Sequence, residues 1–263
     1  MATPTLDPTS RPGSSRGSIP LRKKARELPF PLNMYQTAVG KKWVMAATGL
    51  MLYGFVLFHM IGNLKMYLGK VEHNGAMEYD IDIYGHFLRE LLVPILPHGY
   101  TLWLLRIGLI VAGILHVMSA YHLTRMNMAS SSPYQSKQDF IAANFASRTM
   151  RVSGIVVGAY ILFHLADLTW GLIPGYDWEY GHVYENIVGS LSNPIVALIY
   201  IVANILLAAH LYHGLWSMFQ SLGLSNPRWN NLRRGIATGL SLIILIGNVS
   251  FPIAVLSGIV DVN

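Results

Sequence analysis

Five long apolar segments constrain this chain more than any other feature. They run over about residues 41–68, 100–124, 152–173, 194–219 and 236–259, and each has the roughly twenty residues that a helix needs to cross a bilayer. Only 12% of the 263 residues are charged, against about 25% in soluble domains. Backbone groups in lipid must pair within the protein, which favours helices for spans of this length. The sequence predicts an all-α integral membrane protein with five transmembrane helices in a bundle.

The charges between these segments predict how the chain crosses the membrane. Segments 1–42, 125–151 and 220–235 hold fifteen Lys or Arg and three acidic residues, whereas 69–99, 174–193 and 260–263 hold two basic and nine acidic residues. Short basic loops stay on the cytoplasmic side. We therefore expect a multi-pass protein of the bacterial inner (cytoplasmic) membrane, with its N-terminus in the cytoplasm and its C-terminus outside.

Residues 1–33 differ in composition from the rest of the chain. They are rich in Pro, Ser, Thr and basic residues, which predicts a disordered cytoplasmic tail near anionic lipid, followed by a transmembrane domain over 34–263. The acidic and aromatic loop 69–99 could form a cap on the outer surface. The chain has no cysteine, so other side chains must bind any metal it holds. The sequence shows no convincing internal repeat, and no nucleic-acid partner is expected.

Four of the apolar segments each contain a histidine of interest: His59, His116, His164 and His213. An imidazole inside a membrane is costly and marks a cofactor or a proton path, and imidazole is a frequent axial ligand of haem iron. At about 1.5 Å per residue, His59 and His164 each lie roughly 14 Å from the outer end of their helix. His116 and His213 lie toward the inner ends. The depths predict an outer and an inner pair, each suited to hold a b-type haem between two imidazoles.

Other residues could take part in these sites. His122 and His210 crowd the inner pair, and spacing alone does not choose between His210 and His213. Arg106 could bind the propionates of the outer haem or pair with Asp167. Three arginines at the inner face could bind the inner haem's propionates or only orient the helices: Arg125, Arg148 and Arg151. Five glycines could leave room for a macrocycle or for close helix contact: Gly54, Gly62, Gly113, Gly158 and Gly214.

Three motifs, LHVMSAYHLTR, LFHLADLTW and HLYHGLWSMFQSLG, resemble a known family. It is the single-chain cytochrome b membrane anchor of succinate dehydrogenase and fumarate reductase, respiratory complex II, and the resemblance covers about residues 34–259. It implies two haem b groups on His59, His116, His164 and His213, and it favours His213 over His210. A flavoprotein and an iron–sulfur subunit would be the partners. The chain would be the non-catalytic subunit that passes electrons between the iron–sulfur subunit and menaquinone or another quinone, coupling succinate oxidation or fumarate reduction to the quinone pool.

Several alternatives fit the same residues. An iron–sulfur cluster held by these histidines and a partner's cysteines could replace haem. A proton-coupled transporter could use the histidines as a proton relay, and a purely structural scaffold would leave their matched depths unexplained. The complex could also form a higher oligomer. Candidate residues for quinone lie at both faces: Trp229, His122 and Arg125 inside, and Glu72, Glu78, His86 and Glu90 outside.

Overall fold

The computed structural model describes residue 29 and residues 32–129, 137–224 and 226–261, without the side chains of 32, 129 and 137–148. Nearly all of the expected tail, residues 1–33, therefore lies outside the described residues. The short helix α1 (Leu32–Tyr35) opens the described part and packs against the first long helix.

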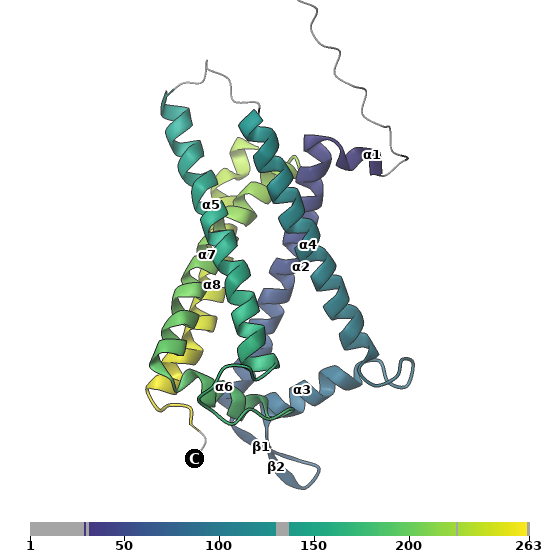
Figure 1. Cartoon of the computed structure of the whole chain (residues 1–263), viewed down its shortest axis with the longest axis vertical. Helices are drawn as coiled ribbons and strands as arrows, with labels where there is room; N and C mark the ends of the chain where they lie inside the picture. The colour runs from purple at the N-terminus through teal and green to yellow at the C-terminus, as the bar shows by residue number, and fades with distance from the viewer. Residues whose placement is uncertain (1–28, 30–31, 130–136, 225, 262–263) are drawn as a thin grey trace, which may run out of the picture.

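Five described helices are long and apolar enough to cross a membrane, which confirms the predicted class and the number of spans (Figure 1). They are α2 (Ala38–Asn63), continued by the 3-10 turn η1 (Leu64–Leu68), α4 (Tyr100–Ala129), α5 (Lys137–His164), continued by the π-helical turn η2 (Leu165–Thr169), α7 (Pro194–Ser221), and α8 (Asn230–Leu256), preceded by the 3-10 turn η3 (Pro227–Trp229). The protein is therefore an all-α membrane protein apart from one short hairpin.

Local sequence signals set where two of these helices begin. The Thr37 hydroxyl accepts a hydrogen bond from the Gly40 N–H and caps α2. The Asn193 side chain accepts from the Ile195 N–H and caps α7, whose first residue, Pro194, has no N–H to satisfy. Both caps satisfy donors that a helix leaves free at its start.

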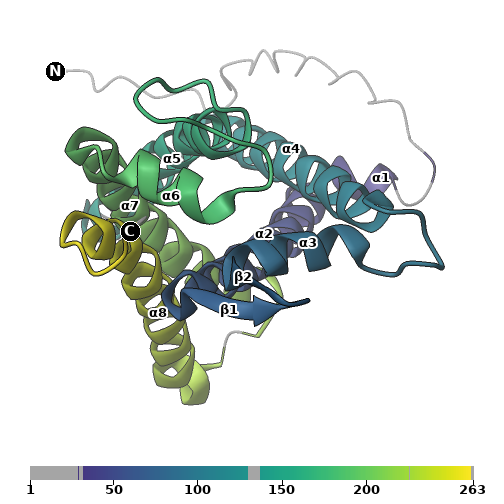
Figure 2. The same cartoon turned by 90° about the horizontal axis from the view of Figure 1, so that it is seen from below.

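The long helices associate in pairs. Helix α2 packs along α4, and α5 packs along α7, while α8 packs along α7 and also contacts α2. The α2/α4 pair and the α5/α7 pair meet where α2 contacts α7. The view along the bundle shows these four helices surrounding a common centre (Figure 2).

Short elements cover one end of the bundle, formed by residues 64–99 and 170–193, which is called the cap end below. The strands β1 (Lys70–His73) and β2 (Ala76–Tyr79) form an antiparallel hairpin, and the helices α3 (Asp80–Glu90) and α6 (Val183–Leu191) lie beside it (Figure 1). The hairpin turns at Asn74 and Gly75, which have φ values of 52° and 83°, as a tight two-residue turn requires. The loop 69–99 is thus an ordered cap.

Contacts among η1, β2, α3 and α6 hold the cap together. The rings of Tyr79 and Tyr184 stack with centroids 3.7 Å apart. An Asp82 carboxylate oxygen accepts from the Tyr184 N–H at 3.0 Å, and burial raises the pKa of the Asp82 carboxyl above its usual 3.8. Lys65 forms an ion pair with Asp80 at 2.6 Å. The opposite end of the bundle includes residues 32–37, 222–224 and 226–229 together with Lys41, Arg125 and Arg151, and it is called the basic end.

Candidate functional site

The structure brings together the two histidines that their depth predicts to be an outer pair. His59 on α2 and His164 on α5 face each other across the bundle near the cap end, with ring centroids 5.9 Å apart and planes at 81°. Phe55 stacks on the His59 ring at 5.3 Å, and Tyr160 lies 5.9 Å from the His164 ring. This pair joins one helix of the α2/α4 unit to one helix of the α5/α7 unit.

The second pair differs from the one expected. His116 on α4 faces His210 on α7, with ring centroids 6.5 Å apart and planes at 66°. His213 instead lines a groove of about 260 Å³ between α7 and α8, together with Thr238 and Ser241. Three residues turn a helix by about 60° less than a full circle, so His210 and His213 point in different directions. The expected pairing of His116 with His213 is not the one that the structure forms.

His116 is held in one tautomer by its neighbours on α2. Thr48 donates its proton to the Val44 carbonyl at 2.7 Å, so its oxygen accepts from His116 Nδ1 at 3.3 Å. The Met45 carbonyl, which can only accept, lies 3.2 Å from the same nitrogen. His116 Nδ1 therefore carries the proton, and Nε2 keeps a lone pair that can bind a metal.

His210 is held in the same way by α5. Ser153 donates to the Thr149 carbonyl at 2.7 Å, so its oxygen accepts from His210 Nδ1 at 3.2 Å. The Met150 carbonyl is a further acceptor for this imidazole. The Nε2 lone pair of His210 is again left for a ligand.

These two environments reveal an internal repeat that inspection of the sequence does not predict. Met45, Thr48, Gly49 and His59 on α2 recur on α5 as Met150, Ser153, Gly154 and His164, with identical spacing. The glycines have matching roles. A Cβ added at Gly49 would lie 3.2 Å from the His116 ring, and one added at Gly154 would lie 3.3 Å from the His210 ring. In each helix pair, a glycine of the first helix thus leaves space for the imidazole of the second helix.

Both pairs have the dimensions of a bis-imidazole metal site. A nitrogen ligand lies about 2 Å from a transition metal, so two imidazoles that share one metal place their ring centroids on the order of 6 Å apart. The observed separations are 5.9 and 6.5 Å. On each of α2 and α5, ten residues separate the glycine level from the histidine level, which is about 15 Å along a helix. The residues fit two metals stacked along the bundle.

Each pair supplies only two histidines, which favours a metal whose other ligands belong to a bound cofactor. Within the part of the chain that the structure describes, no group of three or more His, Asp or Glu side chains gathers to hold a bare ion. Two imidazole nitrogens are one ligand set that a protein can supply to the iron of a porphyrin. A Cβ added at four of the glycines expected to leave room would meet nothing within 4 Å: Gly54, Gly113, Gly158 and Gly214. Gly62 differs, because a Cβ there would lie 2.6 Å from the Tyr84 ring.

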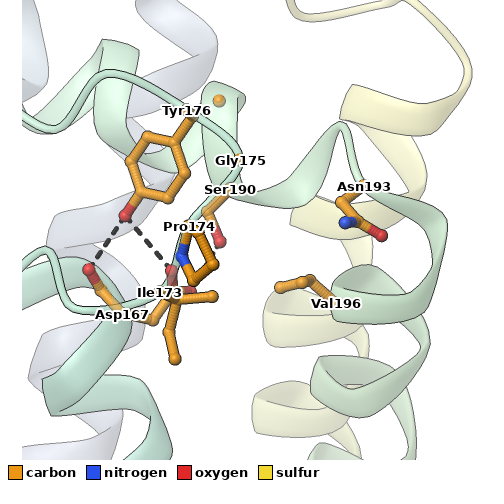
Figure 3. A pocket seen from close by; sticks show the side chains of 9 residues that line it. Asp167, Ile173, Pro174, Gly175, Tyr176, Ser190, Asn193 and Val196 are labelled. Carbon is orange, nitrogen blue, oxygen red and sulfur yellow. Dashed lines mark hydrogen bonds between the residues drawn. The ribbon is translucent and has the colours of Figure 1, made fainter.

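A buried carboxylate lies next to the cap-end pair. Asp167 is in the π-helical turn after His164 and is fully buried. Ser190 and Tyr200 donate to its Oδ2 at 2.5 and 2.8 Å. The Tyr176 hydroxyl lies 3.1 Å from its Oδ1 and 2.8 Å from its backbone carbonyl oxygen, and it donates to these acceptors (Figure 3). Burial, reinforced by Asp167, raises the pKa of Tyr176 above its ordinary value, which keeps this hydroxyl a donor.

The structure also decides between some of the roles expected for the arginines. Arg106 is exposed on α4 with its guanidinium 5.1 Å from the Trp103 ring centroid, so the alternative of an Arg106–Asp167 ion pair is wrong. Arg125 is exposed and donates to the Tyr121 hydroxyl at 3.1 Å. The side chain of Arg148 lies outside the described residues, and Arg151 is an exposed residue of α5.

The quinone candidates are spread over both ends. At the basic end, His122 Nδ1 lies 3.4 Å from the Tyr35 hydroxyl, which also lies 3.2 Å from the Ser119 hydroxyl. Trp229 is exposed near the same end. The acidic and histidine candidates of the cap are all exposed: Glu72, Glu78, His86 and Glu90. Glu78 pairs with His73 at 3.5 Å.

Comparison with known proteins adds no assignment, since no protein-family model, no curated protein and no solved structure matches this chain.

Proposed function

We propose that this protein is a di-haem membrane anchor that passes electrons between an iron–sulfur partner subunit and a membrane quinone. The observation that carries the proposal is the pair of cross-bundle histidine contacts, His59 with His164 and His116 with His210, at 5.9 and 6.5 Å. The assignment to succinate dehydrogenase and fumarate reductase, with their flavoprotein and iron–sulfur subunits, is supported by the three sequence motifs. The ligand set proposed here has His210 in the place that the sequence resemblance gives to His213.

The chain's own histidines would hold the haems through imidazole nitrogens, within an apolar interior. Haem bound there would supply one-electron chemistry. Thr48, Ser153 and Tyr200 hold three of the four imidazoles through Nδ1, which leaves Nε2 of each as the nitrogen that could bind the iron. The 15 Å or so between the two levels, from ten residues of helix, divides the crossing of the bilayer into short steps.

Orientation decides which end meets which partner. With the basic loops in the cytoplasm, the basic end with His116 and His210 would face the iron–sulfur subunit, and the cap-end pair would lie toward the outer surface. Trp229, His122 and Arg125 would then be the quinone candidates nearest the partner, and the cap residues the outer ones.

A reduced-minus-oxidised optical spectrum of the purified protein tests the proposal. We expect the bands of a low-spin b-type haem, with about two haems per chain. Broad iron–sulfur absorption without those bands would promote the alternative of a cluster shared with a partner's cysteines. Intact protein with neither signal would overturn the electron-transfer proposal.

One observation bears on the rival transporter function. Many transporters are built from internal repeats, and the repeat of α2 in α5 is such a feature. A transporter would need no haem and no redox partner. Co-purification from mild detergent therefore distinguishes the two functions, because we expect a flavoprotein and an iron–sulfur protein to accompany the anchor, whereas a transporter would be recovered without them.

A further inference from the structure

His164 differs from the other three histidines of the two pairs in the hydrogen-bonded groups next to its Nδ1 atom. Its Nδ1 lies 3.3 Å from the Tyr200 hydroxyl, and that hydroxyl donates to Asp167 Oδ2 at 2.8 Å. Asp167 follows His164 by three residues, within the π-helical turn η2. The π turn thus brings a carboxylate from the histidine's own segment behind a tyrosine of α7.

The directions of these hydrogen bonds are fixed by chemistry. Tyr200 has one hydroxyl proton, and it points to the carboxylate, so its oxygen can only accept from His164. His164 Nδ1 must then carry a proton, and Nε2 keeps a lone pair that can bind a metal. The chain runs from Nδ1–H through the tyrosine oxygen to the carboxylate.

Asp167 is surrounded by hydroxyl groups. It accepts hydrogen bonds from three hydroxyls, those of Ser190, Tyr200 and Tyr176, and none of the described basic side chains forms an ion pair with it. The adjoining cavity, about 10 Å³, has room for at most one water, so the carboxylate acts on protein groups and not on a larger ligand (Figure 3).

The basic-end pair has no such charge. The Nδ1 atoms of His116 and His210 meet neutral oxygens of Thr48, Met45 and Ser153. A carboxylate behind a ligand imidazole raises the electron donation of its Nε2 and stabilises the oxidised metal. The two haem levels should therefore differ in reduction potential for a reason visible in this chain.

We propose that Asp167 and Tyr200 are positioning residues that fix the tautomer of His164 and lower the reduction potential of the haem it binds. The inference rests on the proposed di-haem function and adds to it a residue pair outside the ligand set. Neither residue touches the metal. Both act through His164.

Redox titration of the full chain purified with its partners tests the inference. The cap-end haem is first identified as the one missing from His59→Ala. Tyr200→Phe should raise the midpoint potential of that haem and shift its ferric EPR signal, while the other haem stays unchanged. Asp167→Asn, which keeps the side-chain size but removes the charge, should raise the potential less. Tyr160→Phe is the matched control, because its ring contacts both His164 and Tyr200 but its hydroxyl meets Asn204 instead.

Each outcome decides the inference. An unchanged potential in Tyr200→Phe, or the same shift in Tyr160→Phe, overturns it and leaves the di-haem function intact. Absence of haem from the unmodified protein overturns the proposed function and the inference together. Loss of the cap-end haem in Tyr200→Phe alone supports positioning. If both tyrosine variants lose it, Asp167→Asn decides, and an unchanged potential in that variant overturns the inference.

Discussion

His116 and His210 face each other across the bundle with ring centroids 6.5 Å apart, and this contact changes the ligand set that the sequence suggests. His213 lies three residues further along α7 and lines the groove toward α8. His210 packs against Ser153 and Gly154 of α5, and a Cβ added at Gly154 would lie 3.3 Å from the imidazole. The packing of α5 on α7 therefore determines which histidine enters the bundle.

Replacing the two histidines of α7 separately should distinguish them. We expect His210→Ala to lose one of the two haems, because no other imidazole among the described residues is placed to replace it opposite His116. His213→Ala should keep both haems, since this side chain points to the α8 groove. Pyridine haemochrome analysis of the purified variants measures the haem content. Loss of a haem from His213→Ala with full content in His210→Ala would contradict the structural pairing.

Larger side chains at the two glycines that lie against the imidazoles should displace these rings. Gly49→Val and Gly154→Val should each remove the basic-end haem, because even a Cβ would come within 3.2 or 3.3 Å of the His116 or His210 ring. The repeat predicts that the two variants behave alike. Gly239→Val is the control, since this glycine is exposed on α8 and a Cβ there meets nothing within 4 Å. Optical spectra and haem content report the result, and equal losses in all three variants would show a general defect in folding.

The oxygen atoms behind the ligands give a graded test. Thr48→Val and Ser153→Ala each remove one acceptor of an imidazole Nδ1–H, and loss of such a partner costs roughly 10–100-fold in metal affinity. The backbone carbonyls of Met45 and Met150 remain as acceptors, so we expect weaker retention of the basic-end haem and not its absence. Competition with a haem-binding protein such as apomyoglobin measures the rate of loss. Rates equal to those of the unmodified protein would show that the carbonyls alone suffice.

Hydropathy predicted the five long apolar helices of this protein. Apolar segments of twenty or more residues identify the spans because lipid demands complete backbone pairing. Depth at 1.5 Å per residue paired His59 with His164, since both lie on helices that run in the same direction. Residues one turn apart, such as His210 and His213, have similar depths, so depth does not decide between them.

The missing information was how α7 is rotated about its own axis. Met45, Thr48, Gly49 and His59 share their spacing with counterparts on α5, but this spacing does not say which of the two α7 histidines faces the bundle. No sequence pattern indicates which residues surround Asp167. Its donors Tyr176, Ser190 and Tyr200 come from a loop, α6 and α7, and only the π turn and the packing of three segments bring them together.

The cap gives a prediction that depends on pH. Burial raises the pKa of Asp82 above its usual 3.8, so the folded state holds this proton more tightly than the unfolded state does. Its contribution to stability is therefore complete below about pH 4 and is lost as the pH rises through the raised pKa. Asp82→Asn keeps an acceptor for the Tyr184 N–H but cannot ionise. The melting temperature of this variant, relative to that of the unmodified protein, should rise between about pH 4 and pH 7. Asp177→Asn, at an exposed carboxyl, is the control, and parallel pH curves for Asp82→Asn and the unmodified protein would contradict the prediction.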